Sequence, residues 1–365
     1  MAKIRIAIAG VGNCASALLQ GIEFYRHASP QAPPVGLMHY NLAGYLPTDI
    51  EVACAFDIDR RKVGRPLEEA CFAPPNNTVT IWRDLPHYGV NVVMGEQLDG
   101  VAPHMTEYPP ERTFVPANQP AVDIERHLRD TGAEVLLCYL PVGSQLAVER
   151  YARACLATGV SLVNCMPVFI VSDDKWANEF TRRAIPVVGD DVKSQLGATI
   201  LHRTIMKVFA DRGIKLRHTY QLNTGGNTDF LNMLDRSRLG SKRISKTSAV
   251  QSVLPQPLPA DDVHIGPSDY VAWQRDNKIC FLRVEGEGFG GTPIELELRM
   301  SVQDSPNSGG IVIDVIRCVK LARDRKIGGP LHSISAYSMK HPPQQIIDDL
   351  ARQRVEMFVK GEIER

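Results

Sequence analysis

Gly10-Val11-Gly12-Asn13-Cys14-Ala15 is the stretch that decides the fold of this chain. It follows a β-branched apolar run at residues 4–9 and opens a helical pattern of small and apolar residues at 14–22. The first glycine permits a tight turn, the second lets the main chain approach a pyrophosphate, and Ala15 lets the helix pack closely on the strand. The N-terminus of that helix faces the anion. These features predict a Rossmann-type dinucleotide site rather than an ordinary strand–helix turn. The expected cofactor contacts in this turn are Gly10, Gly12, Asn13 and Cys14.

A carboxylate follows the second predicted strand, where Rossmann proteins read the adenosine ribose. Asp57 would accept hydrogen bonds from both ribose hydroxyls and repel a 2′-phosphate, so we predict NAD rather than NADP. The interval from the glycines is about twice the usual one because a proline-rich excursion at residues 27–46 intervenes. Asp59 is an alternative ribose partner, and Arg60 and Arg61 could instead serve a 2′-phosphate.

The first half of the chain alternates β-branched runs with helical patterns, which is typical of a parallel α/β sheet. Strands are predicted at residues 52–56, 135–140, 160–165 and 185–188. Helices are predicted at residues 145–158, after a Ser172 cap, and at 193–211, where Gly213 ends the helix.

The pattern changes after Gly213. Residues 215–222, 279–284 and 294–302 alternate apolar and polar positions, as expected of a half-exposed antiparallel sheet. Ser305 and Pro306 then open a helix, and a last helix is predicted at 344–359. We therefore predict an α/β fold with a Rossmann-type NAD-binding domain and an inserted α+β domain for catalysis and oligomerisation. The first domain comprises residues 1–212 and 303–365, and the inserted domain comprises 213–302.

Composition excludes several classes of protein. The 365 residues are 44% hydrophobic and 22% charged, which is typical of a globular chain. Acidic and basic residues number 41 each, which argues against a nucleic-acid or membrane-surface partner. No apolar run is long enough to span a bilayer. The eight cysteines form no CxxC pair, so we expect reduced thiols, a cytoplasmic location and no structural zinc.

Polar residues gather in three stretches where apolar ones would be expected. Residues 189–194 follow a predicted strand, and the carboxyl ends of parallel strands are where such sheets bind ligands. One of the two aspartates there is expected to cap a helix, and at least one to act in the site. Residues 222–230 pair glycines with carboxamides, which suits close approach to a ligand. In the third stretch, 240–246, two lysines four positions apart share a face if the segment is helical; a solvated basic turn is the alternative.

Lys278, Asp304 and Lys340 complete a scattered set of lysines and aspartates. Arginine keeps its proton at working pH, whereas a partly desolvated lysine can release one. A cluster of this kind facing NAD could bind a sugar phosphate and relay protons.

Together these segments resemble the inositol-3-phosphate synthase family in its shorter bacterial branch. The resemblance covers nearly the whole chain, and its carrying segments are residues 10–14, 139–144, 189–194, 225–229, 241–247 and 304–308. It implies that bound NAD⁺ oxidises the C5 hydroxyl of glucose 6-phosphate, which acidifies the C6 hydrogens. C6 then attacks the C1 aldehyde, and NADH reduces the C5 ketone to give 1D-myo-inositol 3-phosphate without net redox change.

The resemblance also implies residue roles and partners. The catalytic group would comprise Asp191, Lys242, Lys246, Lys278, Asp304 and Lys340. Lys242 would relay the proton at the C5 oxygen, Lys246 and Lys278 would steady oxyanions and the phosphate, and Lys340 would help to hold the substrate. Further cofactor contacts would be Ser144, Ser194 and Asp229. The family is homotetrameric through its middle sheet, and some members use a cation, for which Asp191, Asp229 and Asp304 could supply oxygen ligands.

Two other functions fit parts of this pattern. An NAD-dependent polyol or semialdehyde dehydrogenase would share the Rossmann turn and could use a lysine–aspartate pair, but it would release NADH. A non-catalytic NAD-sensing or scaffold protein would leave the set of lysines and Asp304 unexplained.

Overall fold

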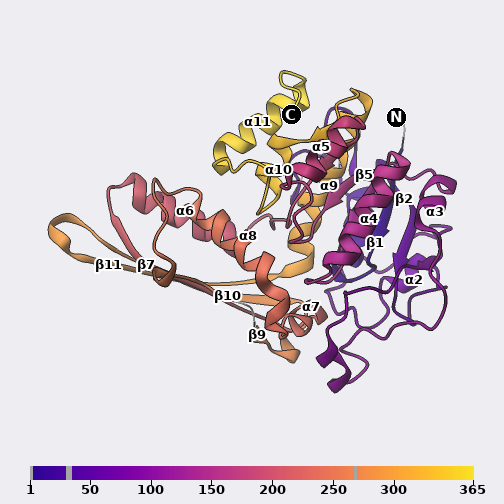
Figure 1. Ribbon diagram of the computed structural model, residues 1–365, viewed down its shortest axis with the longest axis horizontal. Helices are drawn as coiled ribbons and strands as arrows, with labels where there is room; N and C mark the ends of the chain where they lie inside the picture. Colours follow the sequence, from indigo (N-terminus) through magenta and orange to yellow (C-terminus); the bar gives the residue numbers. More distant parts are fainter. Residues whose placement is uncertain (1–2, 30–34, 267–268) are drawn as a thin grey trace.

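Two β-sheets organise the chain in the computed structural model, which describes residues 3–29, 35–266 and 269–365. Within these residues the first sheet has seven strands in the order β12-β6-β5-β4-β1-β2-β3, and the second has the order β11-β10-β7-β8 with β9 also beside β7. Figure 1 shows the second sheet extending to one side of the body that contains the first. The predicted α/β fold class is confirmed.

The first sheet is parallel throughout. Its strands are β1 (Ile4–Ala9), β2 (Ile50–Asp57), β3 (Val92–Met94), β4 (Val135–Cys138), β5 (Ser161–Asn164), β6 (Pro186–Val188) and β12 (Gly329–Pro330). Ala9 pairs with Phe56 on one side and Cys138 on the other, so the carboxyl ends of the central strands meet at one edge. The sequence did not predict β3 or β12, which are too short to give a periodic signal.

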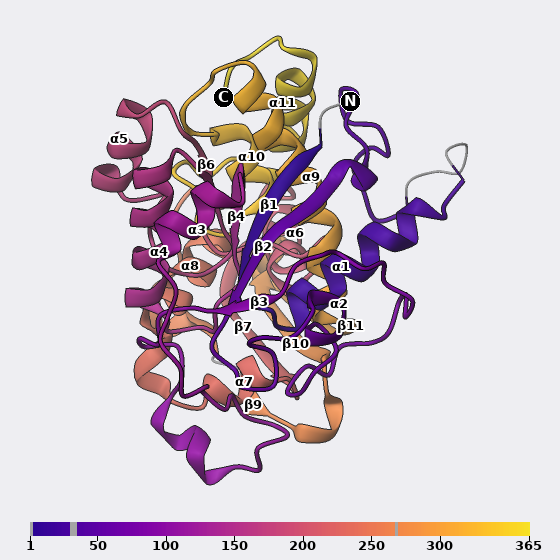
Figure 2. The same cartoon turned by 90° about the vertical axis from the view of Figure 1, so that its right-hand side faces the viewer.

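Helices cover both faces of this sheet (Figure 2). On one face lie α1 (Asn13–Arg26) and α9 (Asp304–Asp324), and on the other lie α3 (Ile124–Asp130), α4 (Gln145–Thr158) and α5 (Asp174–Arg182). The remaining helices of this body are α2 (Leu67–Ala70), α10 (His332–Ser338) and α11 (Asp348–Lys360). Both helical layers bury apolar side chains against the sheet, and no helix in the described residues is long and apolar enough to cross a bilayer.

The second sheet joins three long antiparallel strands to two short ones. Its strands are β7 (Lys215–Gly225), β8 (Val263–Ile265), β9 (Asp269–Tyr270), β10 (Asn277–Glu287) and β11 (Pro293–Gln303). Alternate residues of β10 pack against α6 (Ala198–Asp211), which in turn contacts α8 (Gly240–Gln251). Short elements complete the chain: α7 (Thr228–Asn232), η1 (Pro47–Asp49), η2 (Pro103–Glu107), η3 (Arg236–Leu239), η4 (Ala260–Asp262), η5 (Ala272–Gln274) and η6 (Phe289–Gly291). The predicted loop at residues 27–46 is irregular where it is described; residues 30–34 lie outside the described part.

Several predicted helix starts were wrong because tertiary contacts decide them. The helix predicted from residue 193 begins at Ala198, since the preceding main chain donates to Ser338 and Asn307 instead of forming a turn. Asp173 rather than Ser172 caps α5, because the Ser172 hydroxyl donates to Asp190.

The C-terminal helices also differ from the prediction. Ser305 lies inside the first turn of α9, whose first residue is Asp304, so it is not the cap. The last helix begins at Asp348 rather than near residue 344, and a separate unpredicted helix, α10, precedes it.

Candidate active site

A single cleft lies where the carboxyl edge of the parallel sheet meets the end of the second sheet. It is lined by the glycine turn, by the loops after β4 and β6, and by residues of β7, α8, β10 and α9. The lining includes every residue predicted for the site: Gly10, Gly12, Asn13, Cys14, Asp57, Ser144, Asp191, Ser194, Asp229, Lys242, Lys246, Lys278, Asp304 and Lys340.

The glycine turn at one end of the cleft has the form that a dinucleotide requires. Gly10 has a φ of +95°, and a Cβ there would lie 2.5 Å from the carbonyl oxygen of Tyr139. At Gly12 an added Cβ would meet nothing within 4 Å, so space remains in front of the first turn of α1. Because that turn presents main-chain N–H groups and no side-chain cap from Gly12, the residues present fit a bound pyrophosphate.

Asp57 lies at the end of β2, beside the glycine turn. Its carboxylate accepts hydrogen bonds from the main-chain N–H groups of Val11, Ile58 and Asp59 at 2.7–2.8 Å. Asp59, the alternative ribose partner, is instead buried and bound by Arg61, away from the cleft. Arg61 also donates to two main-chain carbonyls, so it does not point at a 2′-phosphate.

Hydrogen bonds fix the side chains of Asn13 and Ser144, and burial decides the charge of Cys14. The Asn13 carboxamide donates to Asn77 and Asp276, and it accepts from the main-chain N–H groups of Asn77 and Thr78. Burial raises the pKa of the Cys14 thiol to about 12, so this side chain is neutral. The Ser144 hydroxyl donates to the Pro141 carbonyl at 2.5 Å just before α4.

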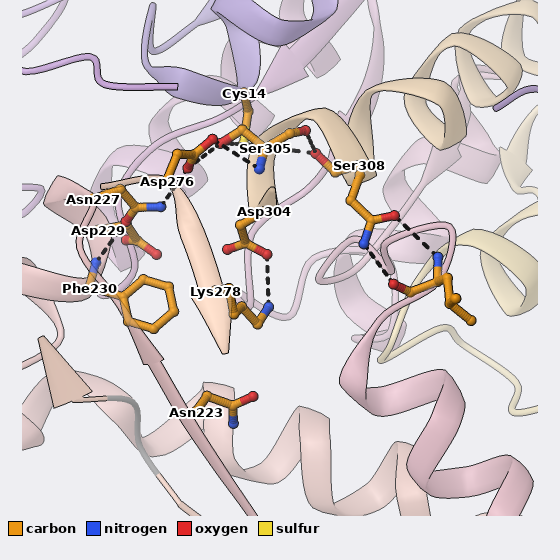
Figure 3. Close-up of polar contacts among 12 residues, drawn as sticks. Cys14, Asn223, Asn227, Asp229, Phe230, Asp276, Lys278, Asp304, Ser305 and Ser308 are labelled. Atoms are coloured by element: carbon orange, nitrogen blue, oxygen red, sulfur yellow. Dashed lines mark hydrogen bonds and ion pairs between the residues drawn. The ribbon is translucent and has the colours of Figure 1, made fainter. Parts of the chain in front are cut away.

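Three lysine–aspartate pairs line the same cleft. Lys340 lies 2.8 Å from Asp191, Lys278 lies 2.8 Å from Asp304, and Lys242 lies 3.6 Å from Asp229. Figure 3 shows Lys278 and Asp304 facing each other. Burial alone would raise the pKa of Asp191 and of Asp304, but the nearby lysines outweigh it and lower both pKa values. Both carboxylates are therefore ionised and face ammonium groups.

Lys246 differs from the other three lysines. It lies one turn after Lys242 on α8, so the predicted shared helix face is confirmed and the solvated-turn alternative is wrong. The side chain of Lys246 is 8% exposed and lines the cleft, and its amine has no hydrogen-bond or ion-pair partner in the described part of the chain. Burial, followed by the charges of Lys242, Lys278 and Lys340, lowers the pKa of Lys246 well below its ordinary value. This amine is placed to accept a proton or to meet an anion.

The two aspartates after β6 have different roles. Asp190 accepts hydrogen bonds from Asn164, from Ser172 and from main-chain N–H groups of residues 170–172, and burial raises its pKa to about 6. Asp191 has a φ of +62° and turns into the cleft, where it accepts from Lys340 and Ser245. The expectation that one aspartate caps a helix was wrong, because α6 begins later, at Ala198.

Two features of the cleft were not predicted from the sequence. Asn223 is only 2% exposed, lines the cleft, and has a side-chain N–H₂ group without a partner among the described residues. A signal existed, because the inward positions 219, 221 and 223 of β7 are all polar. The N-terminus of α6 also lines the cleft at residues 197–200. It was not predicted there because the helix was expected to start at residue 193. Its free main-chain N–H groups are suited to bind an anion.

The three aspartates proposed as cation ligands do not form a cation site. Asp191, Asp229 and Asp304 each face a lysine, and no group of three His, Cys, Asp or Glu side chains in the described ranges could hold a metal ion.

Comparison with known proteins agrees with this geometry. Residues 197–305 match the family model of myo-inositol-1-phosphate synthase. The chain is 50% identical to the inositol-3-phosphate synthase of Corynebacterium glutamicum and 48% identical to that of Mycolicibacterium smegmatis, in each case over 98% of both chains. A solved myo-inositol-1-phosphate synthase-related protein from Thermotoga maritima shares the fold, with a TM-score of 0.83, 24% identity and 98% coverage of both chains. The resemblance in the sequence is thereby confirmed, and the chain belongs to the inositol-3-phosphate synthase family.

Proposed function

We propose that this protein is an enzyme that converts glucose 6-phosphate to 1D-myo-inositol 3-phosphate with NAD as a recycled cofactor. One observation carries the proposal: four lysines and three aspartates line one cleft together with the glycine turn. The chain that forms this cleft is 50% identical to the Corynebacterium glutamicum inositol-3-phosphate synthase. When bound, NAD would supply the hydride chemistry at C5, with no net redox change. The protein supplies binding, orientation and proton transfer.

The nucleotide would lie along the carboxyl edge of the first sheet. Gly10, Gly12 and the start of α1 would hold the pyrophosphate, and Asp57 would accept from the ribose. Ser144, Ser194 and Asp229 would lie toward the nicotinamide, because they line the same cleft as the glycine turn and the lysines. Asp57 supports NAD rather than NADP.

The sugar phosphate would lie among the lysines. Lys246 and Lys278, with the N-terminus of α6, would bind the phosphate and the developing oxyanions, because an anion supplies the acceptor that Lys246 lacks. Lys242 would take and return the C5 hydroxyl proton, and Lys340, fixed by Asp191, would hold the substrate. Since Asp191, Asp229 and Asp304 each face a lysine, a cation near the phosphate or the nicotinamide would need oxygen ligands other than these three side chains.

The second sheet would also join subunits. We propose that residues 1–212 and 303–365 form the NAD-binding domain and that 213–302 form the catalytic and tetramerisation domain. Strand β11 supports this, because it is an edge strand of the second sheet and the fully exposed Phe289 lies in the turn that precedes it. Light scattering should give the mass of a tetramer, and Phe289→Glu should lower that mass. We also propose a cytoplasmic location, supported by eight free thiols.

The decisive experiment incubates the pure protein with NAD and glucose 6-phosphate. Phosphorus and proton NMR should show a cyclic inositol phosphate, while absorbance should show no net accumulation of NADH. Stoichiometric NADH release with an open-chain or lactone product would instead identify a polyol-type dehydrogenase.

A further inference from the structure

A buried carboxylate, that of Asp276, lies just outside the group of residues to which the proposed mechanism assigns roles. It is 1% exposed and directly precedes β10, the strand that carries Lys278. No lysine, arginine or histidine of the described residues lies within ion-pair distance of it, and its partners are neutral donors. Burial and the charge of Asp304 raise its pKa. A buried carboxylate held in this way is costly unless it is well hydrogen-bonded.

The partners of Asp276 come from three separate elements. Oδ1 accepts from Asn13 of the glycine turn at 3.2 Å, from Asn227 at the start of α7 at 2.9 Å, and from the Ser305 hydroxyl at 3.0 Å. Oδ2 accepts from the main-chain N–H of Ser305 at 3.3 Å. Figure 3 shows Asp276 between Asn227 and Ser305, with Cys14 of the glycine turn beside them. One side chain thus connects the nucleotide turn to two elements of the chemical end.

Each connection reaches a lysine–aspartate pair. The main-chain carbonyl of Asp276 accepts from Asp304 at 2.9 Å, which sets the position of the partner of Lys278. Asn227 caps α7 by accepting from Phe230, and that helix carries Asp229, the partner of Lys242. A shift of Asn13 on cofactor binding would therefore be transmitted through Asp276 to both pairs.

We propose that Asp276 is a positioning residue that couples cofactor binding to sugar-phosphate binding, so that each ligand raises the affinity for the other. The proposal rests on the proposed function for the identity of the two ligands. Coupling between two sites is reciprocal and commonly amounts to about 5- to 150-fold in affinity.

The test measures NADH binding by calorimetry with and without glucitol 6-phosphate. This sugar lacks the C1 aldehyde and NADH cannot oxidise it, so no turnover occurs. The parent protein should bind NADH at least about fivefold more tightly when the sugar is present. Asp276→Asn, which places an N–H₂ group against the N–H of Ser305, should reduce that ratio to near one and lower kcat, while the Kd of NADH alone changes by only a few-fold. Asp261→Asn, on an exposed turn, is the control and should keep the parent ratio.

A purely structural role would lower the melting temperature but leave the affinity ratio unchanged, and that result would overturn the proposal. If Asp276→Asn does not fold, Ser305→Ala is tested in its place, because it removes one hydrogen-bond donor to Asp276 and keeps the carboxylate. An unchanged ratio of NADH affinities in Ser305→Ala would also overturn the proposal. If the parent protein binds NADH equally tightly with and without glucitol 6-phosphate, the proposal is also overturned. A parent that shows coupling but forms no cyclic product from glucose 6-phosphate would refute the proposed function and leave the coupling inference standing.

Discussion

Lys340 donates a 2.8 Å hydrogen bond to the carboxylate of Asp191, although the two residues are 149 positions apart in the chain. Their main chains also pair: Lys340 N–H donates to the carbonyl of Asp191, and residues 190 and 341 exchange two further hydrogen bonds. The position of this amine is therefore fixed by main-chain pairing rather than by a flexible loop. The amine of Lys246, by contrast, has no acidic partner in the described part of the chain.

Replacing the two lysines by methionine should change stability in opposite directions. Lys340→Met leaves the buried Asp191 carboxylate without its cation, so we expect a loss of roughly 3 kcal/mol in the free energy of unfolding. Lys246→Met removes an unpaired amine from among three other lysines, so we expect a melting temperature that is higher by a few degrees near neutral pH. Calorimetric melting of both variants checks this, and a destabilised Lys246→Met would contradict it.

Ligand binding should take up a proton. The pKa of Lys246 is lower in the folded protein than in the unfolded chain. Between these two pKa values the folded protein without ligand binds fewer protons at this site, so the contribution of Lys246 to stability increases with pH there. A bound phosphate dianion favours the ammonium form, and its affinity should fall as pH rises through the pKa of the complex. Titration of glucose 6-phosphate into the NADH complex in two buffers of different ionisation enthalpy measures the uptake. Equal apparent enthalpies would refute it, and Lys246→Met should abolish the difference.

Arginine substitutions distinguish the two lysines of α8. Lys242→Arg should lower kcat by on the order of 10²–10⁴ while NAD binding is largely retained, because arginine cannot take the C5 proton. Lys246→Arg should be milder if that residue acts mainly as a charge beside an oxyanion. Steady-state kinetics with calorimetric NAD titration checks both, and the reverse ranking would mean that the relay has been assigned to the wrong lysine.

Cofactor choice should depend on Asp57. Its carboxylate would oppose a 2′-phosphate in a confined site, so we expect clearly tighter binding of NAD than of NADP. Asp57→Ser should reduce that preference, with some loss of NAD affinity because the N–H of Val11 also loses its acceptor. Calorimetry with both dinucleotides measures the ratio, and equal affinities in the parent would contradict the assignment.

The segment from Asp235 to Ser252 should become more protected when the site is filled. It contains α8, whose Lys246 has no anionic partner in the described part of the chain and whose Lys242 faces Asp229. We predict a lid that closes over NAD and substrate, which hydrogen exchange should report as slower exchange in residues 235–252 with NADH and glucitol 6-phosphate present. Peptides of α4 serve as an internal reference, and equal protection with and without ligands would exclude a lid.

The parts of this molecule that follow local rules could be predicted from the sequence. The glycine turn, the buried central strands and the alternating strands of the second sheet each have a signal within about ten residues, and the structure agrees with them. The cluster of site residues was predicted from motifs, because Asp191, Lys242 and Lys246 stand in distinctive contexts. Lys278, Asp304 and Lys340 were singled out by residue type alone, and the family resemblance gave them roles.

The features that were missed depend on partners far away in the chain. The start of α6 is set by pairing with residues near 307 and 338, which no local pattern reveals. The sequence likewise cannot show that Asn223 keeps an unpaired N–H₂ group in the cleft or that the Lys246 amine lacks an acceptor. Both facts depend on which residues of distant segments lie beside these side chains in the fold. Asp276 stands in an unremarkable polar stretch, and only the tertiary structure gives it four donors.

Helix α9 has a consequence for how the protein is made. It supplies Asp304 to the cleft and packs Ile311, Val312 and Val315 onto the first sheet beside α1. A ribosome therefore synthesises β1 to β6 and the whole second sheet before the helix that covers one face of the first sheet emerges. Until then the part of that face beside α1 remains uncovered, so the first domain cannot complete its folding before α9 has been synthesised.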